Sequence, residues 1–182
     1  MIITISGNAG SGKSTVAKII AEKLNLKRYY IGGLRREAAR KRGMTLEEYN
    51  TLGEQDPTTD KEVDEYQREL GNKEDNFIIE GRTSYYFIPH SIKIFVKANE
   101  NVGAERIWKD LNKDPDSRNE AKVANIDELK ESLQKRQKSD ELRYEKYYKI
   151  NPFDESNYDF VVDTSGLTVE QVVEKIVNFV NK

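Results

Sequence analysis

The sequence contains no cysteine and a single histidine, His90. Without cysteine, disulfide bonds and thiolate metal sites are excluded, which fits a reducing compartment such as the cytoplasm. With one imidazole, a histidine-rich zinc site is excluded, and so are most schemes of histidine acid–base catalysis. Because His90 follows Pro89 just before an expected strand, we interpret it as a surface turn residue.

The chain also lacks a long apolar run and a large net charge of one sign. No run approaches the roughly 20 residues that a membrane-spanning helix needs, and we expect no signal peptide, because residues 1–5 already form an apolar run of strand type. The formal net charge of −2 does not point to nucleic acid or to an anionic membrane as a partner. A length of 182 residues suits one domain, 1–182. We therefore expect a cytoplasmic monomer.

A glycine-rich stretch follows the first apolar run. Residues 7–14 have a glycine, four free positions and then Gly-Lys-Ser, which is the phosphate-binding pattern called the P-loop. Glycines let consecutive N–H groups converge on phosphate oxygens. Lys13 would supply a charge for the β- and γ-phosphates, and the Ser14 hydroxyl is a ligand for Mg²⁺. The predicted triphosphate-binding residues are Gly7, Asn8, Ala9, Gly10, Ser11, Gly12, Lys13, Ser14 and Thr15.

Apolar strands and charged helices alternate along the rest of the chain. After the first strand, strands are expected at 27–31, 76–79, 92–96 and 158–162, and helices at about 13–24, 33–42, from 45, about 59–70, about 126–148 and from 168. Capping boxes are expected at three helix starts: Thr45 with Glu48, Thr59 with Glu62, and Thr168 with Gln171. The last helix should bury Val169, Val172, Val173, Ile176 and Val180. Strands separated by helices predict a parallel sheet that is covered on both faces.

Residues 105–149 differ from the rest because they are highly charged and contain few aliphatic side chains. We expect 112–125 to form a mobile loop and the following long helix to bury Leu129, Leu133 and Leu142. The segment would then be an insertion hinged on the core, able to close over a site.

Arginines near the predicted loop favour a kinase. A kinase must bring two anionic substrates together, and fixed cations offset their repulsion. Arg36 lies on the helix after the second expected strand, and Arg82 follows Glu80 at the carboxyl end of the third, beside the P-loop. Short matches to two GTPase patterns, at 72–75 and 163–166, occur in the reverse of the GTPase order, and we interpret them as coincidences.

Two further arginines, Arg136 and Arg143, lie seven residues apart on the long helix. That separation is two helical turns, about 10 Å of rise, and it places both on one face with Asp140 between them. We expect the pair to close over the transferring phosphate and to exclude water.

Together these motifs resemble those of the nucleoside monophosphate kinases, most closely the cytidylate kinases of the archaeal type. The matching stretches are GNAGSGKST, GGLRREAARKRGMTLEEYN, DPTTD, EGR, AERI, RQKSDELRY and YDFVVDTS, and they run over most of the chain. The resemblance implies transfer of the γ-phosphate of ATP to CMP, and also to dCMP, with Mg²⁺. The implied fold is a three-layer α/β/α P-loop domain with a five-stranded parallel sheet of order 2-3-1-4-5, a helical acceptor-binding region at about 32–72 and a helical lid at about 105–149.

The same resemblance implies roles for individual residues. Lys13, Arg82, Arg136 and Arg143 would be catalytic, and Arg106 would lie near the donor nucleotide. Arg36 and Arg82 would hold the acceptor phosphate, and Glu80 would order the water ligands of Mg²⁺. Candidates for contact with the acceptor base are Asp60, Arg82 and Thr83.

Two alternatives remain open at the level of sequence. The acceptor could be AMP, UMP or a non-nucleotide, because arginines recognise phosphate and not base. The chain could also be a non-catalytic nucleotide-binding module, although the intact Lys13, Ser14 and Glu80 argue against it. In either case the expected partners are small molecules, not nucleic acid or membrane.

Overall fold

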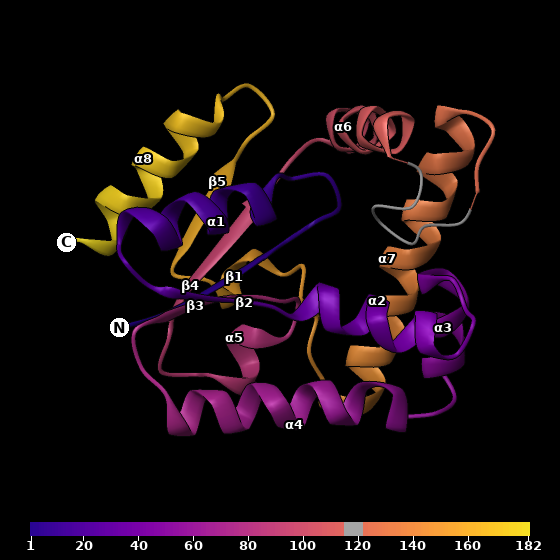
Figure 1. The fold of residues 1–182 in the computed structure, drawn as a ribbon, viewed down its shortest axis with the longest axis horizontal. Coiled ribbons are helices and arrows are strands. Elements are labelled where there is room, and N and C mark those ends of the chain that lie inside the picture. Colours follow the sequence, from indigo (N-terminus) through magenta and orange to yellow (C-terminus); the bar gives the residue numbers. More distant parts are fainter. Residues whose placement is uncertain (115–121) are drawn as a thin grey trace.

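The computed structural model describes residues 1–114 and 122–182 (Figure 1). Within this part of the chain, five parallel strands form one sheet in the order β2-β3-β1-β4-β5, which confirms the predicted topology. The strands are β1 (Ile2–Gly7), β2 (Lys27–Tyr30), β3 (Phe77–Glu80), β4 (Ile92–Lys97) and β5 (Phe160–Asp163). The helices are α1 (Lys13–Lys23), α2 (Ile31–Lys41), α3 (Leu46–Gly53), α4 (Thr58–Lys73), α5 (Ser84–Phe87), α6 (Glu100–Lys113), α7 (Ile126–Tyr148) and α8 (Val169–Val180), with a 3₁₀ turn at Glu155–Asn157.

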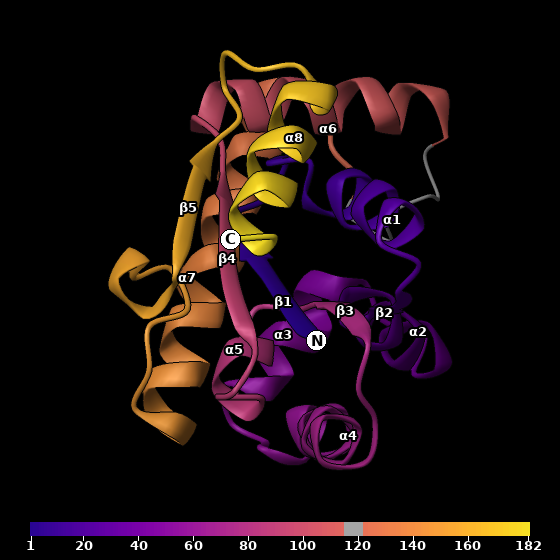
Figure 2. The same cartoon turned by 90° about the vertical axis from the view of Figure 1, so that its left-hand side faces the viewer.

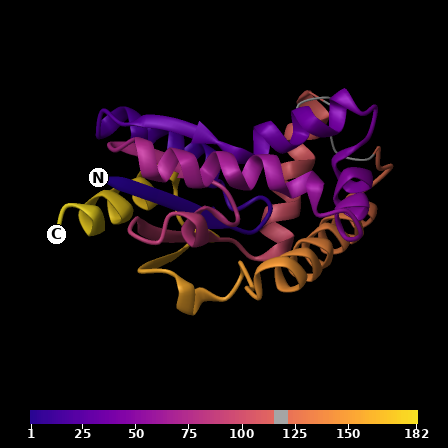
Figure 3. The same ribbon diagram turned by 90° about the horizontal axis from the view of Figure 1, so that it is seen from below.

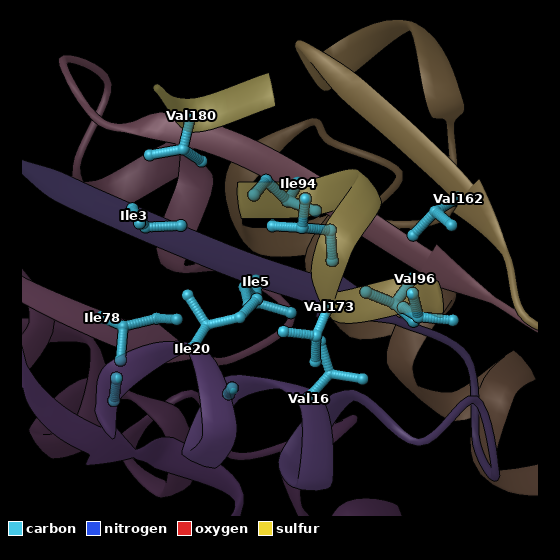
Figure 4. Close-up of a cluster of buried hydrophobic side chains, with 14 residues drawn as sticks. Ile3, Ile5, Val16, Ile20, Ile78, Ile94, Val96, Val162, Val173 and Val180 are labelled. Atoms are coloured by element: carbon cyan, nitrogen blue, oxygen red, sulfur yellow. The ribbon is translucent and has the colours of Figure 1, made fainter. Parts of the chain in front are cut away.

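Helices cover both faces of this sheet, as the apolar strands predict (Figure 2). On one face α1 and α8 pack against the central strands through a cluster that includes Ile5, Ile20 and Ile176, each fully buried (Figure 4). On the other face α4 and α5 pack through a second cluster that includes Phe77 and Ile88. The result is the three-layer α/β/α arrangement.

The remaining helices gather at the end of the molecule that lies away from both termini. There α7 runs beside α3 and α6, and Figures 1 and 3 show it at the far end from the N- and C-termini. Among the described residues, no helix is both long enough and apolar enough to cross a membrane.

Two predicted helix starts are corrected by the structure. Thr45 and Glu48 form the expected capping box, but Thr59 and Glu62 do not, because α4 begins one residue earlier, at Thr58. The carboxylate of Asp56 accepts hydrogen bonds from the Thr58 N–H (2.9 Å) and hydroxyl (2.6 Å), and it satisfies the helix start instead. The second helix also begins earlier than expected, at Ile31, because Gly32 and Gly33 lie inside its first turn.

The apolar side of α7 also differs from the prediction. Leu129 is buried, but Leu142 is 62% exposed. The position that faces the protein interior at that turn is Arg143, which is fully buried and takes the place expected for a leucine. The expected mobile loop at 112–125 falls largely on 115–121, outside the described residues, while residues 112 and 113 belong to α6.

At the C-terminus, Thr168 and Gln171 form the predicted capping box of α8. Four of the five predicted residues are buried, but Val169 is 38% exposed. Its position in the first turn of α8 places it on the wall of a cavity.

Candidate active site

The glycine-rich loop joins β1 to α1 and leaves the start of that helix available to an anion. Gly10 and Gly12 have φ values of 71° and 81°, in the left-handed region that favours glycine. A Cβ at Gly10 would lie 2.2 Å from the carbonyl oxygen of Gly103, so α6 approaches the loop too closely for any side chain there. The N-cap residue of α1 is Gly12, which has no side chain to cap the first turn. The start of a helix with such a cap is suited to binding a phosphate.

Asn8 and Lys13 hold the loop in shape. The Asn8 side chain donates to the Ala98 carbonyl (2.6 Å) and accepts from the Ala98 N–H (3.0 Å), which ties the loop to the end of β4. The Lys13 ammonium donates to the Asn8 carbonyl at 3.1 Å. Lys13 and Ser14 line two cavities at once, so the two cavities meet at this lysine and serine.

One cavity lies between the loop, α6 and α8, and we call it the donor cavity. Its P-loop residues are Gly10, Ser11, Gly12, Lys13, Ser14 and Thr15. Arg106 lines it too, and donates to the Gly10 carbonyl (3.3 Å) and to the hydroxyl (3.0 Å) and carbonyl (2.9 Å) of Thr164. Arg106 thus joins the P-loop to the segment after β5.

The second cavity lies between the P-loop, the carboxyl end of β3 and the helices α2, α4 and α7, and we call it the acceptor cavity. It brings together most of the predicted site: Ala9, Lys13, Ser14, Arg36, Asp60, Glu80, Arg82, Thr83 and Arg136. Gly7 ends β1, and Asn8 lines a smaller neighbouring hollow that also contains Arg82.

Protein groups orient the arginines of the acceptor cavity. Arg36 is nearly buried and donates to the Tyr30 hydroxyl (2.5 Å) and the Gly32 carbonyl (3.1 Å). Arg82 lies 2.5 Å from a carboxylate oxygen of Asp140. Fixed guanidinium groups of this kind can bind a phosphate without a large loss of side-chain freedom.

The spacing on α7 predicted that Arg136 and Arg143 would act at the same site, but Arg143 does not line the acceptor cavity beside Arg136. It is fully buried, and its guanidinium donates to both carboxylate oxygens of Asp60 (2.6 and 2.7 Å) and to Asp140. Burial opposes ionisation of Asp140, but the nearby Arg82 and Arg143 hold its pKa below the usual range. These ion pairs fasten the C-terminal half of α7 to α4.

Asp60, a predicted acceptor-binding residue, is therefore neutralised within the protein. Besides Arg143, it receives Arg35 at 2.5 Å. Arg35 also donates to the Asn50 side chain at 2.8 Å, so the same network includes α2, α3, α4 and α7.

Glu80 lies at the carboxyl end of β3, as predicted, and its side chain is buried. Its Oε1 accepts two hydrogen bonds from Arg28 of β2, from Nε at 2.7 Å and from Nη2. Its Oε2 receives no hydrogen bond from any described residue. One carboxylate oxygen on the cavity wall thus remains available for an outside donor, such as a water bound to a metal ion.

Comparison with known protein families shows which family this chain belongs to. The model of the cytidylate kinase-like family matches residues 2–166. The chain belongs to that family. A cytidylate kinase of Archaeoglobus fulgidus is 36% identical over 181 residues, covering 99% of this chain and 94% of the relative. One of Methanocaldococcus jannaschii is 41% identical over 177 residues, covering 94% and 93%.

Solved structures show the fold of this cytidylate kinase-like protein. A shikimate kinase from Bacteroides thetaiotaomicron superposes with a TM-score of 0.65 at 14% identity, covering 100% of this chain and 99% of that one. A shikimate kinase from Acinetobacter baumannii, in complex with shikimate, gives 0.58 at 17% identity, covering 98% and 92%. At these identities the likeness establishes the P-loop kinase fold alone.

Sequence reasoning missed two polar residues of the acceptor cavity, Asp64 and Gln67, both on α4. Asp64 accepts from the Gln67 amide (3.2 Å) and from the Tyr148 hydroxyl, and burial raises the pKa of its carboxyl to about 7. A signal was present, because positions 60, 64 and 67 are spaced by four and three and so share one face of a helix. That face is polar and buried.

Proposed function

We propose that the chain transfers the γ-phosphate of ATP to CMP, and to dCMP, giving ADP and the corresponding diphosphate. The observation that carries this proposal is the meeting of the two cavities at Lys13 and Ser14. One has the geometry for a triphosphate and the other gathers arginines, in a chain whose relatives are named cytidylate kinases. The acceptor phosphate oxygen would attack the γ-phosphorus, and the bond from that phosphorus to the β-γ bridging oxygen would break as ADP leaves.

On the donor side, the N–H groups of the P-loop would bind the triphosphate, and Lys13 would neutralise charge on its β- and γ-phosphates. The N–H groups at the edge of the Arg106 guanidinium already donate hydrogen bonds to oxygens of Gly10 and Thr164. The flat face of a guanidinium stacks on aromatic rings, so we assign Arg106 to the donor base.

On the acceptor side, Arg36 and Arg82 would hold the CMP phosphate in line with the γ-phosphate, and Arg136 would offset the charge shared by the two. Arg143 would act through the ion pairs that position α7. We propose a lid that includes residues 105–114 and 122–138, with 139–148 attached to the acceptor-binding region.

The residues present fit a Mg²⁺ ion. Ser14 lines both cavities, and Glu80, whose Oε2 receives no hydrogen bond from the described residues, lines the acceptor cavity, where it would bind through water. The described residues hold no cluster of three acidic or histidine side chains that would bind a metal alone. This agrees with Mg²⁺, which commonly takes one or two protein ligands and completes its shell with phosphates and water. When bound, the ion would neutralise charge on the phosphates.

Steady-state kinetics with ATP and five acceptors, CMP, dCMP, UMP, AMP and GMP, test the proposal. We expect the highest kcat/KM for CMP and dCMP. Arg36→Met should raise the KM for CMP by about tenfold or more, because a charge-assisted phosphate contact is lost. Lys41→Met, an exposed cation at the end of the same helix, is the matched control and should change little. A higher kcat/KM for AMP or UMP in the unaltered protein would overturn the assignment of CMP.

We further propose that the protein works as a monomer, because one chain supplies both cavities. We also propose that it acts in the cytoplasm, without nucleic acid or membrane partners.

A further inference from the structure

Two aspartates of α4 line the acceptor cavity, and their surroundings differ in charge. Asp60 is matched by two cations, Arg35 and Arg143. Asp64, one turn later, is only 5% exposed. Among the described residues, the hydrogen bonds that reach its carboxylate come from two neutral groups, the Gln67 amide and the Tyr148 hydroxyl. A buried carboxylate whose direct partners are neutral is costly to keep ionised.

The two neutral donors do not use all the hydrogen-bond acceptor sites of the Asp64 carboxylate. An ionised carboxyl group has about four lone-pair sites, and Asp64 uses one on each oxygen. Because Asp64 lines the acceptor cavity, a bound molecule can use a remaining site. When the carboxyl group is ionised, the ligand group must be a hydrogen-bond donor, since a second acceptor would face an anion.

Gln67 fixes the polarity of this part of the cavity. Its side-chain oxygen accepts from the Ser84 hydroxyl (2.6 Å), while its nitrogen donates to Asp64 (3.2 Å) and to the Thr83 hydroxyl (3.3 Å). The amide is fully buried. The amide cannot rotate by 180° without breaking these bonds. This wall therefore cannot switch from binding a hydrogen-bond donor to binding an acceptor.

The position of Asp64 suits a base and not a phosphate. Lys13 and Ser14, shared with the donor cavity, mark the end where phosphates meet, and α4 contributes nothing to the donor cavity. Apolar side chains from three helices, Ile31, Leu46 and Val63, line the same acceptor cavity and can pack on the faces of a ring.

We propose that Asp64 determines base specificity by accepting a hydrogen bond from the exocyclic amino group of cytosine. Uracil carries a carbonyl oxygen at the corresponding position and would set an acceptor against the carboxylate. The assignment rests on the proposed function and names the group that separates CMP from UMP. Gln67 and Tyr148 act as positioning residues, because each holds one oxygen of the carboxylate.

The test compares three acceptors: CMP, UMP and the 2-pyrimidinone ribonucleoside 5′-monophosphate. The 2-pyrimidinone nucleotide differs from CMP only in lacking the amino group, whereas UMP also carries a proton at N3. The unaltered protein should favour CMP over the 2-pyrimidinone nucleotide by about 10- to 100-fold in kcat/KM, the usual effect of a hydrogen bond to a charged group. In Asp64→Asn the preference for CMP over UMP should fall by about tenfold or more, since the amide can donate to a carbonyl oxygen. The preference over the 2-pyrimidinone nucleotide should fall as well, since the hydrogen bond from the amino group to a charged acceptor is lost. Glu69→Gln removes an exposed carboxylate from the same helix and should leave both preferences unchanged.

Unchanged preferences in Asp64→Asn would overturn the assignment. If that variant does not fold, the unaltered protein still decides, because equal kcat/KM for CMP and the 2-pyrimidinone nucleotide would overturn it too. That result would leave the CMP kinase activity standing. Failure of the unaltered protein to phosphorylate CMP would instead overturn the proposed function, and this assignment with it.

Discussion

Replacing Arg143 with methionine removes three charge-assisted hydrogen bonds from a fully buried site. Methionine keeps a long apolar stem, so the change tests the charge more than the packing. Breaking a buried ion pair by removing one partner costs about 3–5 kcal/mol, because the other charge stays buried. Here each aspartate keeps one arginine, Asp60 with Arg35 and Asp140 with Arg82. We therefore expect a loss near the lower end, about 3 kcal/mol in the free energy of unfolding.

Urea unfolding followed by circular dichroism measures this loss. Arg136→Met, two turns earlier on α7, is the matched control and should cost no more than about 1 kcal/mol, because Arg136 is half-buried at the cavity. Adding Asp60→Asn to Arg143→Met removes a carboxylate that has lost one of its two arginines and should recover part of the stability, which a double-mutant cycle detects. A free energy of unfolding for Arg143→Met within about 1 kcal/mol of the unaltered protein would refute the reasoning.

Three further predictions concern the P-loop, the acceptor wall and α7. Lys13→Ala should lower kcat by about 100-fold or more at unchanged stability, since a preorganised charge is lost; near-normal turnover would exclude the P-loop as the active site. Because the pKa of the Asp64 carboxyl is raised to about 7 from 3.8, the folded state binds the carboxyl proton more tightly than the unfolded state does. This proton binding stabilises the fold at low pH, and the stabilisation is lost as pH rises from 4 to 7. Between pH 5 and 8 the unaltered protein should lose about 2–3 kcal/mol relative to Asp64→Asn, and parallel pH profiles would contradict this. In hydrogen exchange without ligand, 139–148 should be protected, whereas 126–138 should gain protection with a bisubstrate analogue; equal exchange of both halves would contradict their separate attachment.

The parts of the fold that local sequence determines were predicted correctly. Apolar runs defined β1, β3, β4 and β5 of the parallel sheet, and the P-loop was placed between β1 and α1 from its glycines and the following apolar spacing. The capping box at Thr45 was also correct. At α4 the prediction failed because Asp56, in the preceding turn, accepts from the N–H and the hydroxyl of Thr58, and the helix begins there.

The buried charges could not be predicted, because their partners lie far apart in the chain. Arg143 pairs with Asp60, 83 residues earlier, and Glu80 pairs with Arg28, 52 residues earlier. The apolar periodicity of α7 predicts that Leu142 faces inward. Arg143 faces inward instead because Asp60 and Asp140 lie where they pair with it. Asp64 was missed for the same reason, since its burial depends on α7 packing over α4.

The central claim is that this chain phosphorylates CMP, and a competition experiment tests it most directly. The purified protein is given ATP, Mg²⁺ and equal concentrations of CMP, UMP, AMP and GMP, and the nucleoside diphosphates are separated at early times. The rate at which each diphosphate appears then reports the ratio of kcat/KM values. We predict that CDP accumulates fastest among the products of the four acceptors, together with an equivalent amount of ADP. Faster formation of UDP or GDP, or of ADP in excess of all other diphosphates, would contradict the account.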